Sequence, residues 1–154
     1  MAYATFGSSI DIAATPERVW NTVTDWDSQG EWIPLTRTHA VGEPTAGLGG
    51  RVRAWTGVGP IGFWDSMTIT DWEPPRRCEV LHTGTVVRGE AAFEVEGTPQ
   101  GARFTWWERV VLPGGRLGGW AWPVARPVAV ALLDAALRRL RRLVEQEPAP
   151  GQGH

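Results

Sequence analysis

This sequence of 154 residues has no lysine, a single cysteine and no long apolar run. The last two features argue against a disulfide-bonded protein and against a membrane-spanning one. Cys78 cannot form an internal disulfide, and one lone thiol suits a cytosolic protein. The longest apolar stretch, residues 128–133, stops at Asp134, well short of the ~18 residues that a membrane span needs. The first residues lack the basic and apolar regions of a signal peptide. We therefore expect a cytoplasmic protein without a membrane span.

Several chemical signatures are also missing. The net charge of −2 gives no electrostatic sign of nucleic-acid binding, and the exclusive use of arginine as the basic residue reads as a coding bias. No serine lies in a G-x-S-x-G motif. His39, His82 and His154 have no metal-ligand spacing, so we expect no metal and no cofactor. The segment 57–62, GVGPIG, fits the dinucleotide pattern G-x-G-x-x-G, but strand signals on both sides and Pro60 within it favour a hairpin.

Tryptophan, in contrast, is abundant, with ten copies against one tyrosine. Such large, rigid apolar side chains suit the walls of a binding pocket. Three of them, Trp20, Trp26 and Trp32, lie six residues apart, a spacing that fits neither one helix nor one strand. We expect them on a helix, a turn and a second short helix, folded so that all three converge.

The order of the expected elements follows from capping and turn residues. After a strand over 3–12, Thr15 and Pro16 favour a helix start, the segment DWDSQG should end that helix, and a second helical turn should cover 31–35. A long amphipathic helix should run from about 127 to 147, with 148–154 as a disordered tail. Between the helical parts, turn residues separate six predicted strands: 36–43, 50–56, 62–72, 77–83, 87–96 and 102–111.

This order predicts one α+β domain over residues 1–147. The links between strands are too short for parallel crossovers, so the sheet should be antiparallel. It must bury one face, and the only large apolar partner is the final helix. We therefore predict a curved seven-stranded sheet wrapped around that helix, with the two short helices closing one end.

Three polar residues fall in phase with the apolar, core-facing positions of their strands. Asp65 alternates with Phe63 and Met67, His82 with Val80, and Glu108 with Trp106. A buried ionisable group is costly unless it is paired, hydrated or functional. The alternative for each is a place near a strand end, or a bulge that turns it outward. Cys78, which is also in phase, is interpreted as a small core residue.

The segments ATPERVWNTVTDWDSQGEWIP, TITDWEPPRRCEV and GARFTWWERVVLPGG, followed by a terminal helix, resemble the START-like (SRPBCC) superfamily. More narrowly, they are similar to its polyketide cyclase/dehydrase-like group. The resemblance covers about residues 3–147 and implies the helix-grip fold. It also implies a deep hydrophobic pocket for lipids, sterols, polyketides or aromatic metabolites. Its motifs mark the fold and none is a catalytic signature.

Three functions stay open for such a pocket. The first is non-catalytic binding of a flat apolar ligand; the second is a cofactor-independent cyclase or dehydratase. In the second, Glu108 or Asp65 would be the base and His82 or Arg126 the hydrogen-bond donor. The third is an interaction module whose core is filled by its own side chains. A hydrophobic small molecule is the expected partner, with a monomer or homodimer and no nucleic acid. The predicted ligand-binding residues are Trp106, Phe104, Met67, Ile69, Trp55, Trp122 and Arg126, with Trp64 and Trp120 as further candidates.

Overall fold

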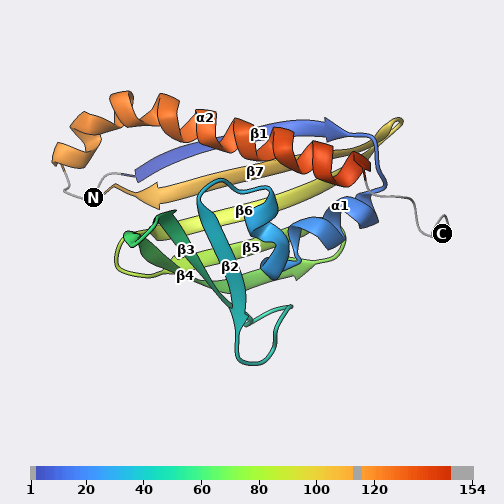
Figure 1. The fold of residues 1–154 in the computed structure, drawn as a ribbon, viewed down its shortest axis with the longest axis horizontal. Coiled ribbons are helices and arrows are strands. Elements are labelled where there is room, and N and C mark those ends of the chain that lie inside the picture. Colours follow the sequence, from blue (N-terminus) through green and yellow to red (C-terminus); the bar gives the residue numbers. More distant parts are fainter. Residues whose placement is uncertain (1–2, 113–115, 147–154) are drawn as a thin grey trace.

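A computed structural model describes residues 3–112 and 116–146, in which one seven-stranded antiparallel sheet carries two helices and a 3₁₀ turn (Figure 1). The strands are ordered β1-β7-β6-β5-β4-β3-β2, so that β1 and β2 form the two edges. The predicted disordered tail, 148–154, lies outside the described residues. The elements are β1 (Tyr3–Ile12), α1 (Pro16–Val23), η1 (Trp26–Glu31), β2 (Thr36–Val41), β3 (Arg51–Val58), β4 (Ile61–Glu73), β5 (Arg77–Thr83), β6 (Arg88–Thr98), β7 (Gly101–Val111) and α2 (Arg116–Gln146).

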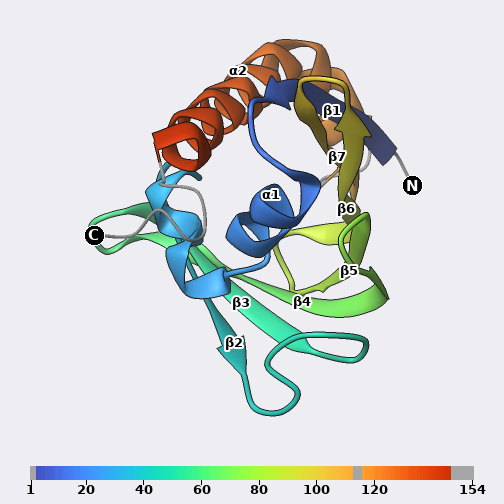
Figure 2. The same cartoon turned by 90° about the vertical axis from the view of Figure 1, so that its right-hand side faces the viewer.

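The sheet curves around α2 and α1, as an end-on view shows (Figure 2). The C-terminal half of α2 packs into the core through a stripe spaced three and four residues apart. Polar bonds fix its position: the Ser8 hydroxyl of β1 donates to Asp134, and the Arg18 guanidinium donates to the Val144 carbonyl at 2.7 Å. The predicted helix-grip architecture is confirmed. The buried residues of the stripe are Leu133, Ala136, Leu137, Leu140 and Val144.

The segment after β1 begins as predicted and then departs from the prediction. Thr15 caps α1, its hydroxyl oxygen accepting from the Arg18 amide at 3.2 Å, and Pro16 opens the helix. The second helical piece is η1, a 3₁₀ helix over Trp26–Glu31, so its prediction over 31–35 was wrong. Small polar residues that break an α-helix are compatible with the tighter, shorter 3₁₀ turn.

The three early tryptophans are all buried, but they make two clusters. Trp20 and Trp26 pack against Trp72 of β4, with ring centroids 5.0 and 6.5 Å away. Trp32 packs instead against Phe93, Phe104 and Trp106, and none of its surface is exposed. The prediction that all three meet at one place is therefore only partly right.

Helix α2 starts at Arg116, well before the predicted start near residue 127. Pro123 and Pro127 lie inside it, four residues apart, so the amide that Pro127 lacks is the one that would bond to the Pro123 carbonyl. Among the described helices, α2 alone is long and apolar enough to cross a membrane. This is weak evidence, because the core helix of a globular protein meets the same criterion.

The segment GVGPIG is a β-hairpin, as predicted. β3 ends at Val58 and β4 begins at Ile61, with Gly59 at a φ of 58° in the two-residue turn. A Cβ on Gly57 would lie 2.3 Å from the Ile61 carbonyl oxygen, so the strands approach too closely for a side chain there. No helix follows this turn, and a pyrophosphate site of the dinucleotide kind is excluded.

The first testable consequence concerns the aromatic core. Trp20→Ala and Trp32→Ala should each lower the free energy of unfolding by ~3–5 kcal/mol, because a large buried ring leaves a cavity. Trp64→Ala is the matched control, since that ring is partly exposed on β4 and should cost no more than about 1 kcal/mol. Urea denaturation followed by circular dichroism measures all three. A small loss for Trp32→Ala would contradict its place in the core.

Candidate functional site

The three polar residues predicted to face inward do so. His82 is buried on β5, and Asp65 of β4 and Glu108 of β7 lie on either side of it. The His82 Nδ1 atom is 2.9 Å from Asp65 Oδ1, and its Nε2 atom is 3.0 Å from Glu108 Oε2. The indole of Trp106 donates to the other oxygen of Glu108, Oε1, at 3.0 Å. Strands β4, β5 and β7 thus assemble one polar cluster from residues far apart in sequence.

The two carboxylates decide the charge of the imidazole. Burial lowers the pKa of His82, but hydrogen bonds and charges from Asp65 and Glu108 outweigh it and raise that pKa to about 10. At neutral pH the ring is therefore an imidazolium that donates from both nitrogens. Both Glu108 oxygens are also occupied. Among the described residues, Asp65 Oδ2 has no hydrogen-bond partner, so it is the carboxylate oxygen of the cluster that is left to accept from a ligand.

Two cavities meet at this cluster. The inner one, of about 170 Å³, lies between the sheet and η1 and includes Thr38, Ala54 and Met67 in its wall. The outer one, of about 700 Å³, lies beneath the N-terminal half of α2 and includes Phe6 and Trp122. The residues that line both are Ile33, Thr36, Thr56, Asp65, His82, Trp106 and Glu108. The polar cluster thus stands at the junction of a small chamber and a larger one.

The inner chamber contains a second polar feature, which the sequence reasoning missed. The Thr38 hydroxyl is buried, and within the described chain it has no hydrogen-bond partner. Thr38, Ala54 and Asp65 are direct neighbours across β2, β3 and β4, so they form one row on the inner face. The period of two in the predicted strand 36–43 could have indicated that Thr38 faces inward, together with Thr36 and Ala40.

The predicted ligand-binding residues divide into three groups. Met67 and Trp106 line the inner chamber, and Trp106 and Trp122 the outer one. Phe104 and Ile69 face inward but lie in the packed core and line neither cavity.

The remaining candidates lie away from both cavities. Trp55 packs edge to face against Trp64. His39 also contacts the Trp64 ring, and the Arg53 guanidinium lies 4.2 Å from the centre of that ring. Trp120 and Arg126 lie on the exposed surface of α2. The structure therefore offers no role at the polar cluster for Arg126.

Cys78 also lines the inner chamber, and burial raises the pKa of its thiol to about 12, as suits a small core residue rather than a nucleophile. The described residues hold no cluster of histidine, cysteine and carboxylate side chains arranged for a metal ion.

Solved structures share this architecture. The di-domain aromatase/cyclase BexL from the BE-7585A biosynthetic pathway matches 95% of this chain at 18% identity and a TM-score of 0.76; the chain spans 51% of that protein. The ZhuI aromatase/cyclase from Streptomyces sp. R1128 matches 97% of the chain at 18% identity, with a TM-score of 0.71 and 99% of its own length covered. Protein CV1439 from Chromobacterium violaceum matches 93% at 14% identity, with a TM-score of 0.70 and 99% of its length covered. No curated protein matches the sequence.

Fold and cavities together define a helix-grip protein with an apolar interior and a polar centre. The model of the family described as "Polyketide cyclase / dehydrase and lipid transport" matches residues 3–145, and the chain belongs to that family. At identities below 20%, the solved structures establish the fold alone, so the chemistry must be argued from the side chains.

The charged state of His82 predicts a pH dependence of stability. Its pKa is higher in the folded chain (about 10) than in the unfolded chain (6.5), so the folded state binds the extra proton. This contribution is complete below about pH 6.5 and is lost as the pH rises toward 10. The free energy of unfolding should therefore fall by on the order of a few kcal/mol across that window.

His82→Gln removes the proposed titrating group. His39→Gln is its control, because His39 is exposed on β2. Urea denaturation between pH 6 and pH 10 should show the fall for the wild type and for His39→Gln. His82→Gln should be less stable at pH 6 and should lack most of the fall. An identical pH profile for all three proteins would show that His82 is not the titrating group.

Proposed function

We propose that this protein binds an uncharged, ring-containing hydrophobic molecule, with part of the ligand in the outer cavity and one ring in the inner chamber. The observation that carries the proposal is the position of the Asp65–His82–Glu108 cluster at the junction of two largely apolar cavities. Apolar walls supply the affinity for such a ligand, and a few polar groups fix its orientation.

The charge of the cluster selects the ligand. Two carboxylates around one imidazolium leave a net negative charge, and no arginine lines either cavity. An anionic group brought to this place would be desolvated next to carboxylates without a compensating cation. A hydroxyl that donates to Asp65 Oδ2 is favoured instead.

The size of the inner chamber also restricts the ligand. An apolar cavity of about 150 Å³ is large enough for one benzene ring, and the chamber here has about 170 Å³. Ala54 separates Thr38 from Asp65 in the row across the sheet, and its small side chain leaves space above the strand. A ring over Ala54 would place oxygen substituents near both the Thr38 hydroxyl and the Asp65 carboxylate. Pairing the Thr38 hydroxyl would relieve a buried polar group that otherwise costs about 1–3 kcal/mol.

Two dyes of the same framework test the choice between neutral and anionic ligands. N-phenyl-1-naphthylamine is uncharged, whereas 8-anilinonaphthalene-1-sulfonate adds one sulfonate. The neutral dye should bind the native protein, with a gain in its own fluorescence and quenching of tryptophan emission. The sulfonate should bind at least about tenfold more weakly, equivalent to about 1.4 kcal/mol. Equal affinities would refute selection by charge, and binding only during unfolding would indicate a core without a usable cavity.

A pair of helix variants locates the dye. Ala129 of α2 lines the outer cavity, whereas Ala131, two residues further, is exposed on the other side of the helix. Ala129→Trp should occupy part of the outer cavity and weaken binding of the neutral dye by about tenfold or more, and Ala131→Trp should leave binding within about twofold. Circular dichroism confirms that each variant is folded. If both bind as the wild type does, the dye occupies another place.

A cyclase or dehydratase is the second candidate function, and a specific observation favours Asp65 as its base. Both oxygens of Glu108 and both nitrogens of His82 are hydrogen-bonded within the protein, whereas Asp65, which lines both cavities, has no partner for Oδ2 among the described residues. Abstraction of an α-proton by Asp65 would neutralise that carboxylate, so the enolate would form beside the His82 imidazolium with Glu108 as the one remaining carboxylate of the cluster. Glu108 would then be a positioning residue that holds the His82 ring.

Deuterium exchange tests this second function without knowledge of the natural substrate. In D₂O near neutral pH, the wild type should accelerate exchange at the α-carbon of 1-tetralone, a neutral aromatic ketone, as followed by proton NMR. Asp65→Asn should keep the fold and the binding of the neutral dye but lose the acceleration. Glu108→Gln should lower stability by about 1–3 kcal/mol, since its pairs with His82 and Trp106 are weakened. No acceleration by the wild type would favour a non-catalytic carrier.

A further inference from the structure

The N-terminal half of α2 exposes apolar side chains to solvent along one face. Leu117, Trp120, Val124 and Val128 follow at helical spacing, and Trp120 and Val124 are 87% and 79% exposed. These four residues are called the outer face of α2. The opposite side of the same half is also apolar, because it covers the outer cavity through Ala121, Trp122 and Ala125. Soluble proteins rarely leave a contiguous face of this kind uncovered.

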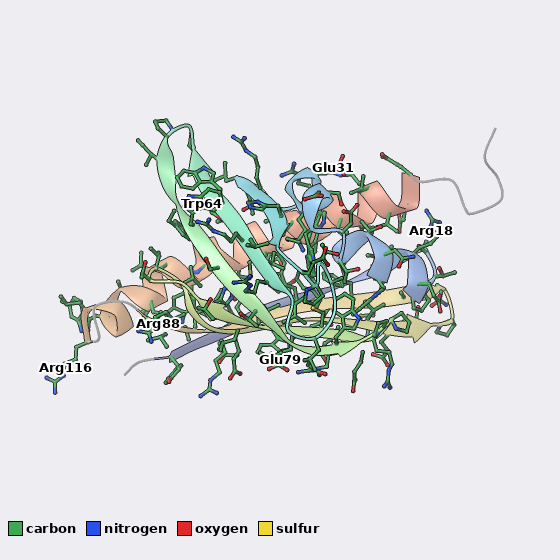
Figure 3. All side chains as sticks on the ribbon, turned by 90° about the horizontal axis from the view of Figure 1, so that it is seen from below. Arg18, Glu31, Trp64, Glu79, Arg88 and Arg116 are labelled. Carbon is green, nitrogen blue, oxygen red and sulfur yellow. The ribbon has the colours of Figure 1, made fainter. Side chains whose placement is uncertain are left out.

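The outer face of α2 continues into the mouth of the outer cavity. Leu117 belongs to both, and Leu35 and Val86 line the same cavity while more than half of each side chain is exposed. At the same end of the molecule lies the β3–β4 turn, with Val58 and the 80%-exposed Ile61 (Figures 1 and 3). Leu35, Val86 and Leu117 are called the apolar rim of the outer cavity, and Val58 and Ile61 are exposed at the same end of the molecule.

Arginine is the charged residue of the exposed half of α2. Residues 116–133 contain two arginines and no acidic residue, and Arg88 is exposed at the start of β6, although the whole chain has a net charge of −2. Figure 3 places Arg88 and Arg116 at this same end. Arg126 is also exposed, further along α2, whereas Arg109 of β7 lies opposite Glu90 of β6.

We propose that the outer face of α2 and the apolar rim dock on an anionic lipid surface, with the cavity mouth turned toward the lipid. A helix with tryptophan, leucine and valine on one face and arginine beside them has the composition of an interfacial helix, and anionic headgroups attract the arginines. A second copy of this chain fits less well. A two-fold contact through this face would bring Arg116 and Arg126 of one copy near those of the other, and residues 116–133 contain no acidic residue to pair them.

Vesicle co-sedimentation with the full chain tests the proposal. The protein should bind vesicles of phosphatidylcholine and phosphatidylglycerol, bind pure phosphatidylcholine vesicles more weakly, and dissociate as the salt concentration rises. Val124→Glu places a charge on the outer face of α2 without touching the cavity wall, and it should weaken vesicle binding by about tenfold or more. Binding of the neutral dye should be unchanged in this variant, so failure here is distinguishable from failure of the proposed ligand site.

Leu48→Glu is the matched control, because Leu48 is 69% exposed on the β2–β3 connection, away from the rim. It should bind vesicles as the wild type does. A wild type that fails to bind anionic vesicles, or an equal loss in Val124→Glu and Leu48→Glu, overturns the proposal. Sedimentation velocity tests the alternative of self-association. If the wild type self-associates but does not bind vesicles, and Val124→Glu abolishes the self-association, the outer face of α2 is a contact between copies of this chain.

Discussion

The interior depends on one interaction, the imidazolium of His82 held between the carboxylates of Asp65 and Glu108. Each carboxylate comes from a different strand, so the cluster forms only when β4, β5 and β7 are aligned correctly. A shift of one residue in any pair would turn a charged side chain to the other face and leave its partner buried without compensation. The same interaction that requires this strand alignment also sets the charge of the cavity. It leaves Asp65 Oδ2 without a hydrogen-bond partner among the described residues.

The inner face of the sheet carries a packed aromatic cluster beside the polar cluster. Around Trp32, the rings of Phe93, Phe104 and Trp106 pack in tilted and edge-to-face arrangements, and Phe93 and Trp106 form one wall of the inner chamber. Trp106 belongs to both environments, because its ring packs on Trp32 while its indole donates to Glu108. The tight cluster therefore orients the carboxylate that in turn orients His82.

The inward residues could be predicted because a strand has a period of two, and Cys78, Val80 and His82 follow it without interruption. That rule fails in β4, where an irregular pairing between Ile69 and Asp71 brings Trp72 to the inner face against Trp20. No local signal marks such a bulge. The start of α2 was also missed, because Pro123 and Pro127 argue against a helix locally, yet their spacing of four residues lets the helix continue with the Pro123 carbonyl left without an amide partner at position 127. Periodicity also leaves the choice of face open, so Trp55 was assigned to the cavity when it lies on the outside.

The distribution of charge connects the interior to the surface. The centre of the cavity carries Asp65 and Glu108, whereas the half of α2 that covers the cavity carries arginine and no acidic residue, so the net charge of −2 is unevenly distributed. A neutral apolar ligand experiences little of this field, whereas an anion attracted to the rim would be rejected at Asp65 and Glu108. The same arrangement therefore allows the rim to approach an anionic surface while the interior remains selective for uncharged molecules. Because the two regions share only residues of the cavity mouth, substitutions on the outer face of α2 and substitutions at the polar cluster should affect separate properties.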